Sequence, residues 1–362
     1  MKDRKATVIG VGMIGGSLCG ALRKRGVTVR GVSSPRTIQK AESLGIIDAG
    51  YEWKKMEDAV DGSDFVFICT PLSDIGKRIP PLLETAGKNT VITDVGSTKT
   101  NICRIAREHK RNGVYFIGGH PMAGKEKRGV ENADPYLFYD AAYVLTPLPG
   151  TPRKVTRTLS SLLASMGANI MILDPELHDR IAASVSHLPQ LLAVLLTNHV
   201  AGKDSDVFRN LAAGGFRDMT RIASSSFDLW KDIIETNRSP IVEALDDFSS
   251  SLQRLTRGID DEDFLRESFH TAHRERQTIP RYGKGFLTPL VDIRVSVRDR
   301  PGELARITNI IFYNDINIKD IEIVTVREGE GGVLRLGFSE KEDALRSAEI
   351  LTGIGYEVSV VE

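Results

Sequence analysis

The sequence predicts a mixed α/β chain with three parts that differ in their hydrophobic pattern. Residues 1–173 alternate short apolar runs with helical segments, which is typical of a doubly wound parallel sheet. Residues 174–280 contain long helical stretches without convincing alternation of period two, so an all-α part is expected there. Residues 288–362 follow the order β-α-β-β-α-β, which predicts a small α+β domain of the ferredoxin-like type.

Charge and cysteine content restrict the class of partner. The 362 residues include 48 Lys and Arg and 48 Asp and Glu, so no net field attracts nucleic acid or an anionic membrane. Cys19, Cys69 and Cys103 form no CxxC pair, which argues against a disulfide framework and against a metal site. We expect small-molecule chemistry in a reducing compartment, with no metal, nucleic acid or membrane as partner.

The N-terminus and the most apolar segment do not predict export or membrane insertion. The charged residues 2–5 precede a short apolar run that ends at Gly10, too short for the core of a signal peptide. The segment Leu188–Leu196 contains Pro189 and Gln190 and is too short to span a bilayer. The sequence therefore predicts a cytoplasmic protein.

A glycine motif near the N-terminus predicts a dinucleotide-binding site. A strand at Ala6–Ile9 precedes Gly10-Val11-Gly12-Met13-Ile14-Gly15, and a helical segment at Ser17–Arg25 leads to a second strand at Val27–Val32. In this context the glycines permit a tight turn and let a pyrophosphate approach the helix N-terminus. The candidate cofactor-binding residues are Gly10, Gly12, Met13, Ile14 and Gly15.

The end of the second strand bears on the choice between NAD and NADP. An acidic residue there ordinarily binds the ribose 2′-hydroxyl, but this sequence has Ser33 and Ser34, followed by Arg36. Without a carboxylate a 2′-phosphate is not repelled, and Arg36 either pairs with it or points into solvent, so the choice stays open. Thr70 and Pro71, which follow a later buried strand, complete the predicted cofactor site.

Further segments complete the outline. Strands are expected at Asp64–Cys69, Thr90–Val95, Val114–Ile117, Tyr143–Leu145 and Ile170–Leu173. Asp174-Pro175-Glu176 predicts a helix start, with long helices at Ile181–Val200 and Ser239–Leu255 and a linker at Tyr282–Gly285.

A histidine on a predicted glycine-bounded turn is the candidate for chemistry. The stretch Gly118–Gly124 places His120 directly after the strand Val114–Ile117. Glycines let backbone approach a ligand, and an imidazole titrates nearest to neutral pH, so His120 can accept a proton there. A second strand end with a glycine turn, Thr93–Lys99, carries the hydroxyl of Ser97.

Two further motifs, Val185–Pro189 and Gly214–Arg221, lie downstream. Together these segments resemble, in order along the whole chain, the prephenate and arogenate dehydrogenases of tyrosine biosynthesis. The resemblance implies oxidative decarboxylation of prephenate to 4-hydroxyphenylpyruvate, in which a hydride passes to the nicotinamide, CO2 leaves and the ring becomes aromatic. It implies NAD as the cofactor, with measurable NADP use in view of Ser33 and Arg36.

The resemblance also implies roles for individual residues. His120 accepts the hydroxyl proton, and Ser97 either orients it through a hydrogen bond or caps the turn. Arg221 is the candidate clamp for a substrate carboxylate, because a guanidinium donates two parallel hydrogen bonds. Arg217 is a second candidate contact, or it forms a structural ion pair with Asp218.

Two more residues are candidates for substrate contact. His187 lies on an otherwise apolar helix, where a core histidine is the usual case, and the resemblance makes it a substrate contact instead. Glu126 matches a family position near the substrate's side chain, and a solvated charge cluster with Lys125 and Lys127 is the alternative.

The C-terminal part resembles an ACT domain, a ferredoxin-like module that binds amino acids. Its predicted regulatory residues are Asp299, Gly302, Asn317 and Ile318. The resemblance implies L-tyrosine as a feedback inhibitor and a homodimer formed through the central helical part. Two alternatives stay open: the C-terminal domain only adds to the dimer interface, or tyrosine inhibits at the active site.

Three other functions remain as alternatives. The chain could prefer arogenate, or it could be a related two-domain dehydrogenase that acts on a β-hydroxy acid with a lysine base, although no such lysine motif stands out. It could also be an amino-acid sensor with an inactive dehydrogenase half, against which the glycine motif, His120 and Arg221 all argue.

Overall fold

The computed structural model describes residues 3–124, 127–202, 211–278, 290–327 and 331–361. The chain divides into two compact units, Met1–Lys284 and Gly285–Glu362. The expected parts 1–173 and 174–280 therefore share one unit, and the predicted linker at Tyr282–Gly285 lies outside the described residues. We keep a domain boundary at residue 173 as a proposal, because the alternation of strands and helices ends there.

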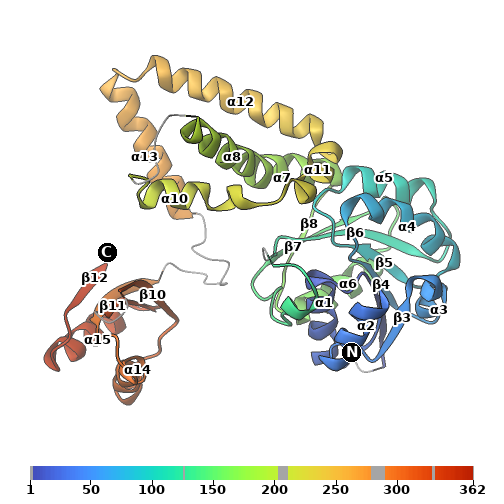
Figure 1. The fold of residues 1–362 in the computed structure, drawn as a ribbon, viewed down its shortest axis with the longest axis horizontal. Helices are drawn as coiled ribbons and strands as arrows, with labels where there is room; N and C mark the ends of the chain where they lie inside the picture. The colour runs from blue at the N-terminus through green and yellow to red at the C-terminus, as the bar shows by residue number, and fades with distance from the viewer. Residues whose placement is uncertain (1–2, 125–126, 203–210, 279–289, 328–330, 362) are drawn as a thin grey trace. The chain divides into compact units, whose positions relative to one another are not determined.

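An eight-stranded sheet forms the first part of the larger unit (Figure 1). The strands are β1 Lys5–Ile9, β2 Thr28–Ser33, β3 Ala49–Glu52, β4 Phe65–Ile68, β5 Val91–Asp94, β6 Tyr115–Pro121, β7 Ala142–Pro147 and β8 Asn169–Ile172. Their order is β3-β2-β1-β4-β5-β6-β7-β8, and every neighbouring pair is parallel except β6 with β7. The chain changes direction across the sheet between β1 and β4, the switch point at which such sheets bind dinucleotides.

Helices cover both faces of this sheet and bury its apolar residues in two layers. One core lies under α1 Met13–Lys24, α2 Pro35–Ser43 and α6 Arg153–Ser165. The other lies under α3 Met56–Val60, α4 Leu72–Thr85 and α5 Thr100–Glu108. Two short 3₁₀ helices, η1 Trp53–Lys55 and η2 Val130–Asn132, complete this part. The doubly wound architecture expected from the sequence is confirmed.

Strand β6 differs from its prediction in a way that matters for the site. It continues through Gly118, Gly119 and His120 to Pro121, because β7 pairs with it antiparallel, so His120 lies in a strand and the expected turn is wrong. The two glycines permit close packing within the sheet: a Cβ at Gly118 would lie 2.3 Å from Thr146 Oγ1, and one at Gly119 would lie 2.5 Å from the carbonyl oxygen of Asp94.

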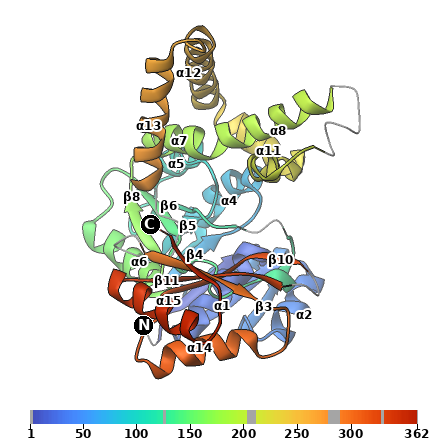
Figure 2. The same ribbon diagram turned by 90° about the vertical axis from the view of Figure 1, so that its left-hand side faces the viewer.

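The central part is all helical, as predicted. It contains α7 Pro175–Ala182, the π-helical turn η3 Ala183–His187, α8 Leu188–Ala201, α10 Gly214–Thr220, η4 Arg221–Ser224, α11 Phe227–Thr236, α12 Arg238–Arg257 and α13 Glu262–Thr278. Asp174 caps α7 by accepting the N–H of Glu176 at 2.9 Å. Figure 2 shows α7 and α8 continuing one another, with η3 between them. Pro189 has no N–H to donate to the preceding turn, which favours this change of helical pitch.

The combined run Pro175–Ala201 is longer than the apolar segment considered from the sequence. Its 27 residues and a mean hydropathy of 1.3 in one window make it long and apolar enough, by composition alone, to cross a membrane. It also carries His178, Asp179 and His187, whose side chains are buried and hydrogen-bonded within the chain. Because polar groups of this kind are costly in lipid, packing within the protein explains the run better.

The smaller unit is an α+β fold of six elements. These are β9 Val291–Val297, α14 Glu303–Tyr313, β10 Asp320–Arg327, β11 Gly331–Phe338, α15 Lys341–Gly353 and β12 Val358–Val361. The antiparallel sheet has the order β10-β11-β9-β12, with one face packed against α14 and α15. Both the element order and the sheet order are those of the predicted ferredoxin-like module.

Candidate active site

His120 lies at the carboxyl end of β6, where the sheet meets the helical part. Its side chain is buried, and its Nδ1 lies 2.9 Å from Nε2 of His178 on α7. The two rings meet edge to face, with centroids 5.1 Å apart and planes inclined by 74°. His120 is therefore held by a residue of the helical part rather than by its own strand.

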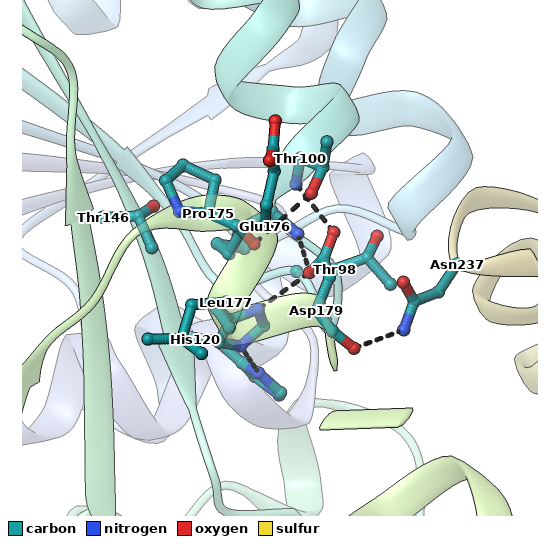
Figure 3. Close-up of polar contacts among 12 residues, drawn as sticks. Thr98, Thr100, His120, Thr146, Pro175, Glu176, Leu177, Asp179 and Asn237 are labelled. Carbon is teal, nitrogen blue, oxygen red and sulfur yellow. Dashed lines mark hydrogen bonds and ion pairs between the residues drawn. The ribbon is translucent and has the colours of Figure 1, made fainter. Parts of the chain in front are cut away.

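Asp179 lies behind His178 and joins α7 to the start of α5. Its Oδ1 lies 2.8 Å from Nδ1 of His178 and accepts the backbone N–H of Lys99 at 2.7 Å, and its Oδ2 accepts the N–H of Thr100 at 2.8 Å (Figure 3). Lys99 is the N-cap residue of α5, which has no side-chain cap of its own. The carboxylate of α7 thus caps α5 from the other part of the chain.

A buried ion pair lies beside this network. Lys99 Nζ pairs with Asp94 Oδ2, and neither side chain is exposed to solvent. Lys99 also donates to the carbonyl oxygen of Gly119 at 2.7 Å, while Asp94 accepts the N–H groups of Gly96 at 2.8 Å and Gly119 at 3.0 Å. These bonds fix the backbone directly before His120.

The electrostatic surroundings keep His120 uncharged. Burial lowers its pKa well below the ordinary value, and the positive charge of Lys99 and the neighbouring His178 and His187 lower it further. An imidazole that stays neutral at working pH has a lone pair and can accept a proton.

His187 ends the π-helical turn and is almost completely buried. Its Nδ1 lies 3.1 Å from Nδ2 of Asn237, which also donates to the carbonyl oxygen of Asp179 at 2.8 Å (Figure 3 shows the second bond). Its ring lies edge to face with Trp230 at 5.8 Å. Burial lowers the pKa of His187 to about 4. The residue is both packed in the helical core and close enough to His120 to influence its charge.

The hydrogen bond expected between Ser97 and His120 is absent from the described part of the chain. Ser97 is half-buried, whereas the neighbouring Thr98 lies 2.9 Å, oxygen to oxygen, from Thr236 on α11. Because β6 extends through His120, the ring turns toward α7 and meets His178 instead.

The glycine motif has the geometry that a dinucleotide requires. Gly10 has φ of 95°, and a Cβ there would lie 2.7 Å from the carbonyl oxygen of Cys69. A Cβ at Gly15 would lie 2.0 Å from the carbonyl oxygen of Gly10, so both positions exclude other residues. A Cβ at Gly12, the N-cap of α1, would meet nothing within 4 Å, and no side chain caps the helix. Met13 and Ile14 form its first turn, open to a pyrophosphate.

The remaining predicted cofactor residues lie near the same sheet edge. Ser33 ends β2 and is buried, Ser34 caps α2, and Arg36 is exposed in the first turn of α2. Thr70 follows β4, and its buried Oγ1 has no hydrogen-bond partner among the described residues. Pro71 is the N-cap of α4. An unpaired buried hydroxyl beside the switch point fits a polar group of a bound cofactor.

The predicted carboxylate-binding arginines lie on the helical part. Arg221 is exposed at the start of η4, and this turn is fixed to α8 because Gln190 donates to the carbonyl oxygen of Ile222 at 2.9 Å. Arg217 is exposed on α10, and the ion pair considered with Asp218 does not form within the described residues. Glu126 lies outside the described residues.

The four predicted regulatory residues do not meet within one copy of the smaller unit. Asp299 and Gly302 follow the carboxyl end of β9, and Gly302 begins α14 with φ of 86°. Asn317 and Ile318 precede β10, whose first residue is level with the start of β9 in the sheet register. The two pairs therefore lie at opposite ends of the sheet, roughly 20 Å apart at about 3.4 Å per residue.

Sequence reasoning missed the residues that hold His120 in place. Asp94, Lys99, His178, Asp179 and Asn237 were not among its candidates, yet all are buried and hydrogen-bonded to one another or to the site. Two signals in the sequence could have identified them. Asp94 and Lys99 flank the turn at Gly96, and the pair His178-Asp179 lies one turn after the helix start at Asp174.

A dinucleotide-binding sheet with a neutral, buried histidine at its carboxyl edge defines the class of an NAD-dependent dehydrogenase. Family models match three consecutive regions: the prephenate dehydrogenase nucleotide-binding domain at residues 18–172, the prephenate dehydrogenase dimerization domain at 174–273 and the ACT domain at 291–352. The chain belongs to the prephenate dehydrogenase family.

Individual relatives agree with this assignment. A prephenate dehydrogenase of Bacillus subtilis is 33% identical over 97% of both chains. The structure of the Aquifex aeolicus prephenate dehydrogenase in complex with hydroxyphenyl propionate and NAD+ is 30% identical, with a TM-score of 0.71, covering 77% of this chain and 99% of that one. A Synechocystis arogenate dehydrogenase structure is 31% identical, with a TM-score of 0.69, covering 76% of this chain and 100% of that one.

Proposed function

We propose that this chain catalyses the oxidative decarboxylation of prephenate to 4-hydroxyphenylpyruvate, with His120 as the base. The observation that carries the proposal is a buried histidine, kept uncharged, at the carboxyl edge of a dinucleotide-binding sheet. Its Nδ1 is engaged with His178, which leaves Nε2 as the nitrogen that faces a substrate.

His120 takes a proton from the substrate and later returns it. The hydroxyl proton moves to Nε2, and the O–H bonding pair becomes part of a carbonyl bond. When CO2 leaves, its C–C bonding pair passes through the ring to this oxygen, which takes the proton back from Nε2 as the phenol forms. When bound, NAD supplies the acceptor for the hydride. The residues that would hold it are the motif Gly10–Gly15 with Ser33, Ser34, Thr70 and Pro71. Loss of CO2 makes the ring aromatic, so the protein needs to position the substrate more than to activate it.

The substrate carboxylates require cations, and the helical part supplies the candidates. Arg221 is proposed as the main clamp and Arg217 as a second contact, with His187 packed beside the substrate site. Support comes from the match of residues 174–273, which include both arginines, to the dimerization domain of the family, and from the fixed position of η4 against α8. Ser97, half-buried one residue before Thr98, is proposed to touch the substrate or cofactor rather than His120.

A homodimer through the helical part is part of the proposal. This part exposes large apolar side chains that a partner subunit would cover, among them Leu195, Phe227, Leu252, Ile259 and Phe269. The three cysteines are all free, which supports a reducing, cytoplasmic location.

L-Tyrosine is the proposed feedback ligand of the smaller unit. Its two predicted binding segments lie at opposite ends of one sheet, so a single ligand that contacts both would have to lie between two copies of the chain. This requirement agrees with the proposed homodimer.

The decisive experiment measures reduced cofactor formed from prephenate and, separately, from arogenate, with wild type and His120→Asn. We expect prephenate to be oxidised and His120→Asn to lower kcat roughly 10²–10⁴-fold with little change in NAD affinity. A preference for arogenate would reassign the substrate. A His120→Asn variant within a few-fold of wild type would remove His120 from the mechanism.

A further inference from the structure

We infer that His178, with Asp179 behind it, is a positioning residue that fixes the proton of His120 on Nδ1 and leaves the lone pair on Nε2 for the substrate. The inference rests on the proposed role of His120 as the base. It starts from an unbroken chain of buried contacts: Asp179 Oδ1 to His178 Nδ1 at 2.8 Å, and His178 Nε2 to His120 Nδ1 at 2.9 Å.

The direction of each hydrogen bond follows from Asp179. Its two oxygens face the backbone N–H groups of Lys99 and Thr100, which can only donate, as well as the ring of His178. A carboxyl group surrounded by donors is ionised and only accepts. Burial raises the pKa of Asp179, but the hydrogen bonds from His178, Thr100 and Lys99 outweigh it and leave that pKa below its ordinary value. His178 therefore carries a proton on Nδ1.

For a neutral His178, the hydrogen bond between the two rings has only one arrangement. With His178 uncharged, its Nε2 is an acceptor, so Nδ1 of His120 must be the donor. A neutral His120 with its proton on Nδ1 has its lone pair on Nε2. The opposite tautomer would present an N–H to the substrate hydroxyl and could not take its proton. An acid that orients an imidazole acts in the same way in the serine protease triad.

A purely structural role must be distinguished, because the same contacts also join the sheet to the helical part. Asp232 of α11 provides the matched control: it accepts the backbone N–H of Ser73, in the first turn of α4, at 3.0 Å. Asp232 therefore caps α4, a helix of the nucleotide-binding part, from the helical part, as Asp179 caps α5. Unlike Asp179, it has no hydrogen-bonded link to His120 within the described residues.

The test compares His178→Leu with His178→Gln in the full-length enzyme. Leucine removes the acceptor for the His120 N–H, whereas the glutamine amide oxygen reaches the same place and can accept it. We expect His178→Leu to lower kcat roughly 10²-fold, with the prephenate KM and the NAD affinity within a few-fold of wild type, and His178→Gln to recover most of the loss. Should His178→Leu not fold, His178→Asn replaces it, because its shorter amide can still bond Asp179 but does not reach His120.

Several results would overturn the inference. Leucine and glutamine variants with equal kcat would show that the acceptor at residue 178 does not matter. A kcat loss no larger than that of Asp232→Ala, which removes the acceptor for the Ser73 N–H, would assign the network to domain packing alone. The His120→Asn variant, measured alongside, separates the two proposals: if it is inactive while His178→Leu is not, only the positioning role fails, and if it is fully active, the assignment of the base fails.

Discussion

Lys99 and Asp94 form an ion pair in which neither side chain has any solvent-exposed surface. The pair lies next to the backbone of Gly119, one residue before His120. Lys99 donates to the carbonyl oxygen of Gly119, and Asp94 accepts the N–H of Gly119. Because each charge is costly to bury alone, removing one partner destabilises a protein far more than replacing both.

Lys99→Met should therefore lower the free energy of unfolding by about 3–5 kcal/mol, measured by urea denaturation. In the double variant Asp94→Asn/Lys99→Met no unpaired charge remains, so part of that loss should be recovered. Equal stability of the single and double variants would show that the charges do not depend on each other.

The same change should move the pH dependence of catalysis. Burial and, next to it, the charge of Lys99 lower the pKa of His120, so without Lys99 that pKa rises toward the ordinary value. A base works only when unprotonated, and the acidic limb of kcat/KM against pH should therefore shift to higher pH, in the single and the double variant alike. An unmoved limb would mean that His120 is not the titrating group.

Arg221→Ala should raise the KM for prephenate more than it lowers kcat, because a carboxylate clamp acts in the ground state and in the transition state alike. Arg221→Lys keeps the charge but loses the paired hydrogen bonds, so its KM should fall between those of wild type and Arg221→Ala. Steady-state kinetics at saturating NAD measure this. An unchanged KM in a folded Arg221→Ala variant would exclude the clamp.

Ser33→Asp should suppress NADP use while sparing NAD, since a carboxylate at the end of β2 repels a 2′-phosphate and can bond a 2′-hydroxyl. The measurement is the ratio of kcat/KM for the two cofactors. Arg36→Ala serves as the partner variant. If the exposed Arg36 pairs with the 2′-phosphate, NADP use falls in this variant too, because an attraction is lost, whereas Ser33→Asp adds a repulsion. A constant ratio in both variants would show that this strand end does not contact the ribose.

A chain that ends at Lys284 should remain active and lack the inhibition by L-tyrosine that we propose for the full-length enzyme. The larger unit is compact without the smaller one, which favours its folding alone. Couplings between such sites are typically about 1–3 kcal/mol, or roughly 5–150-fold in affinity. Asn317→Ala in the full-length enzyme tests the same site with less disturbance. If the shortened enzyme is active and equally sensitive, tyrosine acts at the active site.

The sequence was sufficient for the architecture because the three parts differ in hydrophobic period. Period-two alternation in β9 and the strand–glycine–helix order around α1 are local signals, and both predictions are confirmed. Strand β3, Ala49–Glu52, was missed because its four residues form neither an apolar run nor a clear alternation. The extension of β6 to Pro121 was missed because antiparallel pairing with β7 decides it, and glycines do not signal a strand.

The site was only partly predictable for a related reason. His120 stands in a distinctive local motif, so its candidacy needed no tertiary information. Its partners come from far along the chain: His178 is 58 residues away, and Asp179 bonds Lys99 across 80 residues. From the sequence, the hydroxyl of Ser97 on a nearby turn was the expected hydrogen-bond partner of His120. Only the packing of α7 on the sheet edge shows that the imidazole of His178 is the partner instead.

Asp179 and Asp232 each complete a helix that belongs to the other part of the chain, α5 and α4 respectively. Neither of these helices has a side-chain cap from its own neighbours. If the helical half were exchanged for that of a distant relative, a stable hybrid would therefore require that the new half also place carboxylates at the starts of α4 and α5. A cut at residue 173 separates two regions by pattern, but the first region does not carry all of the groups that finish its own helices.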